Sequence, residues 1–301
     1  MMELNALGLL DDADIDLVEA GITLALADRP AADPARLRRL VSGWAIALQR
    51  DTAPVSGSGR ARLLSGLIAS ETGLTGATED YDNPLNADLI ALVERGRGLP
   101  VALSILYVAL ARRVGWRADA LNLPGHVIVE VCGGVEPALI DPFDHGTGIT
   151  RERAVEIARH GGGDAAPVRF DPMTNRQLLI RLITNQASRA RNAGDAPRAL
   201  RLYERMTLIA PQLTSLWWER ARLEQSLGHN QAARASLTAM LETTHEPALT
   251  RRIHAALTAL ARAMTFPSQS PKLLQMNNAA NETLCTHGYS GHNLYMAILF
   301  R

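Results

Sequence analysis

Cysteine is nearly absent from this sequence. Only Cys132 and Cys285 occur among 301 residues, and they stand far apart. Two distant cysteines exclude a framework of disulfides and are typical of a reducing compartment, so we expect the protein in the cytoplasm. No cysteine and histidine residues have the spacing of a metal site, and no motif requires a cofactor. We therefore predict neither a metal nor a cofactor.

Excess charge and long apolar runs are also missing. The 31 basic and 31 acidic residues give a formal net charge of zero and a pI near 7.1. This balance excludes bulk attraction to nucleic acid or to anionic membranes. No apolar run is long enough to span a bilayer, and residues 1–21 lack the basic start of a signal peptide. We expect no direct nucleic-acid partner and no membrane association.

Lysine is scarce as well, because Lys272 is the only lysine in the chain. It falls in a C-terminal stretch, residues 264–301, in which asparagine accumulates. Arginine is missing there between Arg262 and Arg301. This change in composition separates an atypical tail from the rest of the chain, and the sequence leaves open whether that tail is disordered, divergent or the product of a frameshift.

Apolar periodicity predicts a mainly helical first half. Asp33-Pro34 and Asn83-Pro84 each combine an N-cap residue with a proline at the first helical position. Apolar residues follow both signals at helical spacing. Pro100 opens a further helix, which is apolar on every side as far as Leu110 and stops at Gly115. A helix that is apolar all round should be buried on all sides.

Three short strands are predicted after this helix, at residues 118–123, 126–132 and 138–141. Gly133-Gly134 is expected to form a two-residue hairpin turn between the last two strands. In that register His126 lies opposite Asp141, with Cβ atoms about 5 Å apart. A loop longer by two residues would shift the pairing but keep both side chains on one face. Pro137 conflicts with a regular ladder at this point. The register predicts an ion pair or hydrogen bond between His126 and Asp141.

A buried helix, a strand that opens with histidine and a strand that ends at aspartate form the layout of a cysteine–histidine–aspartate site. A thiol in the first turn of a helix is acidified by the helix dipole, an imidazole takes its proton, and a carboxylate orients the imidazole. His126 and Asp141 fit the last two roles, but Pro100 stands where the cysteine would be. The simpler interpretation is that His126 begins a strand and Asp141 begins a turn, and the sequence leaves both open.

No other residue is a good substitute for the missing thiol. Ser104 lies one turn along the helix and is expected in the core. Cys132 faces the same side as His126, but the strand separates them by about 20 Å at roughly 3.3 Å per residue. The acidic residues within 11–14 precede a helix, and its dipole explains them without a metal.

The second half is helical and repetitive. At a shift of 34 residues, four pairs of positions superpose: Ala187 on Ala221, Gly194 on Gly228, Ala199 on Ala233, and Tyr203 on Leu237. A period of 34 with small residues at these offsets is the pattern of tetratricopeptide repeats, in which the small residues let paired helices approach closely. A generic alanine-rich helical hairpin is the alternative.

The segment from residue 82 to 146 resembles the bacterial SirB-type family, and the resemblance extends over roughly residues 10–250. It implies an α+β, papain-like transglutaminase-like domain followed by tetratricopeptide repeats. In catalytic transglutaminase-like relatives a G-x-C motif opens the buried helix; here the triplet is Gly98-Leu99-Pro100. The resemblance places the histidine of the triad at His126 and its aspartate at Asp141.

Three regions are therefore expected. Residues 1–170 form the transglutaminase-like domain, residues 171–263 the tetratricopeptide-repeat domain, and residues 264–301 the atypical tail. Because proline carries no nucleophile, the favoured function is non-catalytic: binding of a protein or peptide partner in a regulatory or assembly role. The alternative is a hydrolase or acyltransferase that uses His126 and Asp141 with an unassigned nucleophile. No residue pattern identifies the partner-binding surface or the number of subunits.

Overall fold

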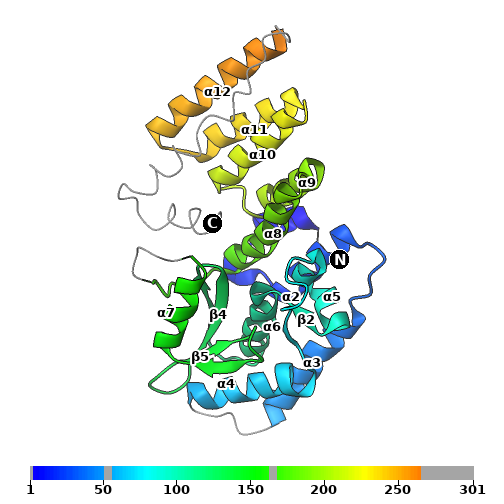
Figure 1. Cartoon of the computed structure of the whole chain (residues 1–301), viewed down its shortest axis with the longest axis vertical. Coiled ribbons are helices and arrows are strands. Elements are labelled where there is room, and N and C mark those ends of the chain that lie inside the picture. The colour runs from blue at the N-terminus through cyan, green and yellow to red at the C-terminus, as the bar shows by residue number, and fades with distance from the viewer. Residues whose placement is uncertain (1–2, 51–55, 163–167, 266–301) are drawn as a thin grey trace. The chain divides into compact units, whose positions relative to one another are not determined.

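The computed structural model describes residues 3–50, 56–162 and 168–265 (Figure 1). Contacts divide the chain into two compact units, Met1–Leu182 and Ile183–Arg301. The division falls inside a helix that begins at Asn175, whereas the boundary at 170/171 stays a prediction from the sequence. Of the expected tail, only Met264 and Thr265, the end of a helix, lie within the described residues. None of the helices in the described ranges is long and apolar enough to cross a bilayer.

The first unit is mainly helical, as the periodicity predicts. Its helices up to the sheet are α1 (Leu4–Leu9), the short η1 (Asp12–Asp14), α2 (Leu17–Asp28), α3 (Ala35–Arg50), α4 (Gly57–Ser65), η2 (Gly66–Glu71), η3 (Pro84–Ala87), α5 (Leu89–Arg95) and α6 (Pro100–Arg113). Helix α7 (Arg151–His160) follows the sheet, and α8 (Asn175–Asn192) begins in this unit.

Capping side chains set several of these helix starts. The Asp33 carboxylate accepts the Ala35 backbone N–H at 2.9 Å, which confirms the predicted cap of α3. The prediction of a single helix after Asn83-Pro84 is wrong, because two capping residues start two separate helices. Asn83 caps η3 through Leu85 N–H at 3.0 Å. Asp88 then begins α5 by accepting from Ala91 N–H at 2.8 Å.

One cap in this unit could not be read from the sequence. The Asp12 carboxylate accepts the backbone N–H groups of Asn175 and Arg176, each at 2.9 Å, at the start of α8. The dipole of the next helix in sequence is therefore the wrong explanation for Asp12. That helix, α2, is capped by Asp16, which accepts from Val18 N–H at 2.9 Å.

The sheet of the first unit is antiparallel and follows chain order, β3 (Ala118–Leu123), β4 (His126–Val131), β5 (Ala138–Asp141) and β6 (Thr147–Ile149). The first three strands confirm the prediction, whereas β6 is an addition. A separate two-stranded parallel pair joins β1 (Thr75–Gly76) to β2 (Arg97–Gly98), immediately before α6. These two-residue strands carry no alternating pattern, so the sequence could not reveal them.

The predicted two-residue turn at Gly133-Gly134 is wrong. Val131 pairs with Ala138 and Val129 with Ile140, so the loop spans residues 132–137 and the register is shifted by two residues. Pro137 cannot donate to the ladder, and the Gly133 carbonyl instead accepts the N–H of Gly57 at 2.8 Å. An even shift preserves the faces, so His126 and Asp141 still point to the same side.

Helix α6 forms the centre of the first unit. It contacts β3 and β4 on one side and α2 and α3 on the other. Its residues from Pro100 to Val108 are all buried, which confirms the prediction of a helix buried all round. Helix α7 covers the opposite face of the sheet (Figure 1), where Ala154 and Ala158 pack against Leu121 and Ile128.

The second unit consists of paired helices: the end of α8, then α9 (Ala196–Ile209), α10 (Thr214–Ser226), α11 (Asn230–Thr243) and α12 (Pro247–Thr265). The four pairs of residues that superpose at a shift of 34 occupy equivalent positions in the two repeats. Gly194 and Gly228 form the interhelical turns with φ of 74° and 78°, a conformation that favours glycine. The other six are buried: Ala187, Ala199, Ala221, Ala233, Tyr203 and Leu237.

Candidate functional site

His126 and Asp141 meet at the end of the sheet in the first unit. Nε2 of His126 lies 2.8 Å from Oδ1 of Asp141, and the two side chains are 14% and 7% exposed. The same Asp141 oxygen accepts the backbone N–H of Phe143 at 3.0 Å. Asp141 is thus held by its own turn while it holds the imidazole, so the expected contact forms despite the shifted register.

The contact with Asp141 defines how His126 can act. A carboxylate accepts a hydrogen bond, so Nε2 is the donor in this contact, and Nδ1 is the nitrogen that a neutral ring would present as a base. This is the arrangement that activates a nucleophile next to Nδ1. Among the residues that the structure describes, no hydroxyl or thiol forms a hydrogen bond with the His126 ring.

The start of α6 holds no reactive group. Pro100 is the first helical residue and is buried, and Leu99 before it makes no side-chain cap. Ser104 is fully buried, and its hydroxyl donates to the carbonyl of Val127 at 3.3 Å. Cys132 lies beyond the other end of β4, where its carbonyl accepts from Arg60 at 2.7 Å. Neither Ser104 nor Cys132 forms a hydrogen bond with the His126 ring.

Phe143 connects the imidazole to the segment that precedes α6. Its ring meets the His126 ring edge-on with centroids 5.8 Å apart, and it meets Tyr81 in the same way at 6.0 Å. Its carbonyl accepts the N–H of Gly76 at 3.0 Å. Gly76 pairs with Gly98, two residues before Pro100. Phe143 therefore contacts both His126 and a strand pair that leads directly into α6.

Gly76 is required for this contact. A Cβ atom at position 76 would lie 2.5 Å from the Phe143 ring, well inside van der Waals contact. Only a residue without a side chain lets the backbone approach the ring so closely. The glycine could be seen in the sequence, but its partner Phe143 is 67 residues away, and no local pattern links the two.

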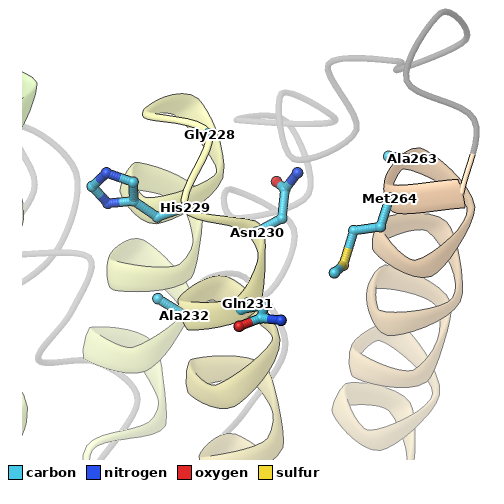
Figure 2. Close-up of a pocket in the computed structure, with 7 residues that line it drawn as sticks. All are labelled: Gly228, His229, Asn230, Gln231, Ala232, Ala263 and Met264. Atoms are coloured by element: carbon cyan, nitrogen blue, oxygen red, sulfur yellow. The ribbon is translucent and has the colours of Figure 1, made fainter.

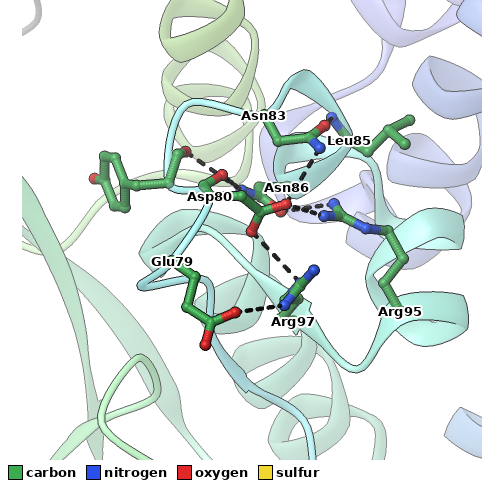
Figure 3. A network of polar contacts seen from close by, with 8 residues as sticks. Glu79, Asp80, Asn83, Leu85, Asn86, Arg95 and Arg97 are labelled. Carbon is green, nitrogen blue, oxygen red and sulfur yellow. Dashed lines mark hydrogen bonds and ion pairs between the residues drawn. The ribbon is translucent and has the colours of Figure 1, made fainter.

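A polar network fixes the loop between β1 and α5 (Figure 3). Asp80 pairs with Arg95 and, at 3.4 Å, with Nε of Arg97. The side-chain amide of Asn86 donates to the Asp80 carbonyl at 2.6 Å, while its own carbonyl oxygen accepts from Arg95 at 2.7 Å. The Asn86 backbone carbonyl accepts the N–H of Leu99 at 2.8 Å. The network thus fixes the residue that precedes Pro100.

The charges of this network change the acidity of Asp80. Burial acts to raise the pKa of the Asp80 carboxyl, but the guanidinium groups of Arg95 and Arg97 outweigh it and hold that pKa below its ordinary value. Asp80 is therefore ionised at neutral pH and serves as an anchor. No local pattern predicts a role for these residues, although two acids at 79–80 and two arginines within 95–97 are visible in the sequence.

A buried tyrosine lies near the same end of the sheet. Burial and, to a smaller degree, the charge of Asp141 raise the pKa of Tyr107 to about 12. Tyr107 is therefore protonated at neutral pH. Its buried hydroxyl has no hydrogen-bond partner among the described residues, and the nearby Ser65 hydroxyl donates to the Gly146 carbonyl at 2.7 Å. A Cβ atom at Gly146 would lie 2.3 Å from its hydroxyl, so the loop after Asp141 packs closely on it.

The described part of the chain has no group of three or more histidine, cysteine, aspartate or glutamate side chains that could hold a metal ion. A pocket of about 540 Å³ lies in the second unit (Figure 2), lined by Gly228, His229, Asn230, Gln231, Ala232, Ala263 and Met264. His229 is the only titratable side chain in this lining, and its ring is turned away from Met264 (Figure 2). The pocket has no arrangement suited to catalysis.

Fold and site together define a transglutaminase-like domain followed by tetratricopeptide repeats. Residues 35–184 match the Transglutaminase-like superfamily, and residues 187–264 match the Tetratricopeptide repeat family. The predicted fold class is confirmed: an α+β domain with a small antiparallel sheet precedes an α-helical repeat region.

The chain is similar to a UPF0162 protein of Xylella fastidiosa strain 9a5c, with 26% identity over 257 residues, which is 82% of this chain and 92% of that protein. The UPF0162 protein of strain Temecula1 matches to the same extent. F-box only protein 21 of Mus musculus is 36% identical over 66 residues, which is 22% of this chain and 10% of that protein. No solved structure matches.

Proposed function

We propose that this protein is non-catalytic and binds a protein or peptide partner in a regulatory or assembly role. The observation that carries the proposal is Pro100 at the first position of α6, where catalytic transglutaminase-like relatives have cysteine. Tetratricopeptide repeats generally mediate contacts between proteins, and the match over residues 187–264 supports a binding role.

The chemistry of the site supports the same proposal. A histidine base accelerates acyl transfer only when a nucleophile lies within hydrogen-bond reach of its free nitrogen. The Ser104 hydroxyl already donates to a backbone carbonyl, and Cys132 lies at the far end of the strand. We infer that His126 and Asp141 are triad members that remain without the attacking group, and that their hydrogen bond now stabilises the end of the sheet.

One observation favours a second function. The 2.8 Å contact leaves Nδ1 of His126 as a base, and such a base could activate a water molecule. In this alternative the protein is a hydrolase or acyltransferase that uses His126 and Asp141. It differs from the first proposal in a property that can be measured, the cleavage or crosslinking of amides.

We also propose a place and mode of action. The two distant cysteines favour the cytoplasm. The neutral net charge supports a regulator that acts through proteins and does not bind nucleic acid directly.

The test measures amide chemistry on the full chain. Fluorescent casein serves as substrate for cleavage, and dansylcadaverine with casein serves for crosslinking. We expect no turnover above the no-protein blank for the wild type, for His126→Ala or for the control His254→Ala, an exposed histidine of α12. Turnover by the wild type and by His254→Ala that His126→Ala abolishes would contradict the proposal and establish the enzyme.

A further inference from the structure

Helix α3 of the first unit carries positive charge and no acid. It contains Arg36, Arg38, Arg39 and Arg50 but neither aspartate nor glutamate. Arg38 pairs with Glu19 at 2.6 Å. The other three arginines are exposed, and their side chains form no ion pair or hydrogen bond with any residue that the structure describes. These three cations are thus left without an anion.

The three arginines share one face of α3. At about 100° per residue, Arg36, Arg39 and Arg50 fall within roughly 60° of one another around the helix axis, and they span about 21 Å along it. Gly43 and Ile46 lie between them on the same side, and Ile46 is 52% exposed. We call these five residues the basic face of α3. It combines positive charge at both ends with an exposed apolar side chain in the middle.

Gly43 has no role of its own in the described fold. It lies inside a helix, where glycine costs roughly 1 kcal/mol relative to alanine. Its backbone does not require glycine, because its φ is not positive. A Cβ atom added there would meet nothing within 4 Å. A residue without a side chain at an exposed position lets the backbone of another helix approach closely.

The composition of this face favours an acidic helix as the partner. The guanidinium fork matches a carboxylate in two parallel hydrogen bonds. A helix can present carboxylates and apolar side chains in a single stripe, as Ile46 and the arginines do. A bilayer fits less well, because the apolar side of α3 is buried and Ile46 is the only large apolar side chain that the helix exposes.

We propose that the basic face of α3 binds an acidic amphipathic helix of a partner protein. Carboxylates of that helix pair with Arg36 and Arg39 at one end and with Arg50 at the other. Its apolar residues pack on Ile46 and against the backbone at Gly43. This inference rests on the proposed function and gives the partner a docking surface and a chemical character.

Fluorescence anisotropy of a labelled peptide added to the full chain tests the inference. The peptide is a helix of alanine, leucine and glutamate, as long as the basic face, with leucines at its centre and glutamates toward both ends. A second peptide carries glutamine in place of every glutamate. We expect the glutamate peptide to bind at least tenfold more tightly, and its affinity to fall as salt is added. Equal binding of the two peptides, or no binding of either, would overturn the inference.

Two matched substitutions locate the binding on α3. Arg39→Gln should weaken binding of the glutamate peptide about tenfold, as expected for the loss of one charge-assisted pair. Arg38→Gln is the control, because it removes the same charge from a neighbour that pairs with Glu19 and is turned by about 100° around the helix. Equal effects of the two substitutions would mean that the peptide responds only to net charge, and would overturn the inference.

Gly43→Gln tests the close approach. Glutamine is a good helix former, and a Cβ atom at this position meets nothing in the described fold, so the variant should stay folded. We expect it to weaken binding of the glutamate peptide about tenfold, and unchanged binding would overturn the packing at Gly43.

Sedimentation with vesicles of phosphatidylcholine and phosphatidylglycerol tests a membrane as the partner instead. We expect no vesicle binding that depends on Arg39. Binding that Arg39→Gln abolishes and Arg38→Gln preserves would overturn the inference in favour of a lipid surface. Failure of the proposed function would appear separately, as amide turnover that depends on His126.

Discussion

In the first unit, Asp80 is paired with Arg95 and Arg97, and Asp141 is paired with His126. In the second unit, Arg252 stacks on Trp218 without an acid partner among the described residues. The Asp80 and Asp141 carboxylates near the candidate site are thus paired with cations of their own unit, whereas the Arg252 cation of the repeats lies against an aromatic ring. The contrast is between carboxylates held by ion pairs in the first unit and a cation held by a ring in the second.

Removal of Asn86 should be the most damaging of the changes that test this contrast. Asn86→Ala removes the oxygen that accepts from Arg95 and the amide that donates to the Asp80 carbonyl. The Asn86 side chain that makes both bonds is fully buried. We expect the free energy of unfolding to fall by roughly 2–3 kcal/mol, measured by urea denaturation. Gln49→Ala, at an exposed position of α3, should change it by less than about 0.5 kcal/mol. A loss no larger than that of Gln49→Ala would show that the Asn86 hydrogen bonds do not stabilise this unit.

Gly76→Ala should have a somewhat smaller effect. The added methyl group would overlap the Phe143 ring, which must move away from His126. We expect a loss of about 1–3 kcal/mol in thermal or urea unfolding. Gly43→Ala is the control, since nothing lies within 4 Å of its added Cβ in α3. That change should be neutral or stabilise by up to about 1 kcal/mol, and equal losses at both glycines would show that Phe143 is not held in place.

The Asp80 network should also make stability depend on pH. The pKa of Asp80 is lower in the folded chain than its ordinary value of 3.8, so its contribution is complete above that value. The contribution is lost as the pH falls through the lower, folded pKa. Urea unfolding from pH 6 down to pH 3 should therefore show a steeper loss of stability for the wild type than for Asp80→Asn. Parallel curves would mean that the ion pairs contribute nothing.

The smallest effect on stability is expected at Arg252. Arg252→Gln removes a stacked cation but also a like-charge repulsion, so the free energy of unfolding should change by less than about 1 kcal/mol. Urea denaturation measures this change alongside Asn86→Ala. A loss as large as that of Asn86→Ala would assign Arg252 to the structure of the repeats and remove the contrast between the units.

The parts of the fold that depend on local patterns could be predicted from the sequence. The all-apolar run after Pro100 identified a buried helix, and the 34-residue period identified the repeats with both turn glycines. The sequence also predicted that the side chains of His126 and Asp141 lie on the same face of the sheet. This prediction survives the shifted register, because a shift by an even number of residues preserves the face to which each side chain points.

Contacts between distant segments could not be predicted in this way. The cap that Asp12 provides for α8 joins residues 163 positions apart. The contact between Gly76 and Phe143 depends on the two-residue strands β1 and β2. The stack of Arg252 on Trp218 joins two helices, and the apolar pattern that predicts each helix does not involve this contact. In each case the sequence shows the residue but contains no pattern that specifies its partner.

The central claim is that the site retains the environment of a triad without its nucleophile. Pro100→Cys tests it most directly in a chain whose Cys132 and Cys285 are serine, by the pH dependence of thiolate absorbance near 240 nm. A thiol at the start of α6 feels the helix dipole and, if the site is intact, the His126 base.

We predict that the introduced thiol ionises well below the ordinary thiol pKa of about 8.5, and that His126→Ala in the same chain moves its pKa back toward that value. Urea denaturation of both variants controls for folding. An introduced thiol in a folded chain that ionises near its ordinary value, with or without His126, would contradict the account.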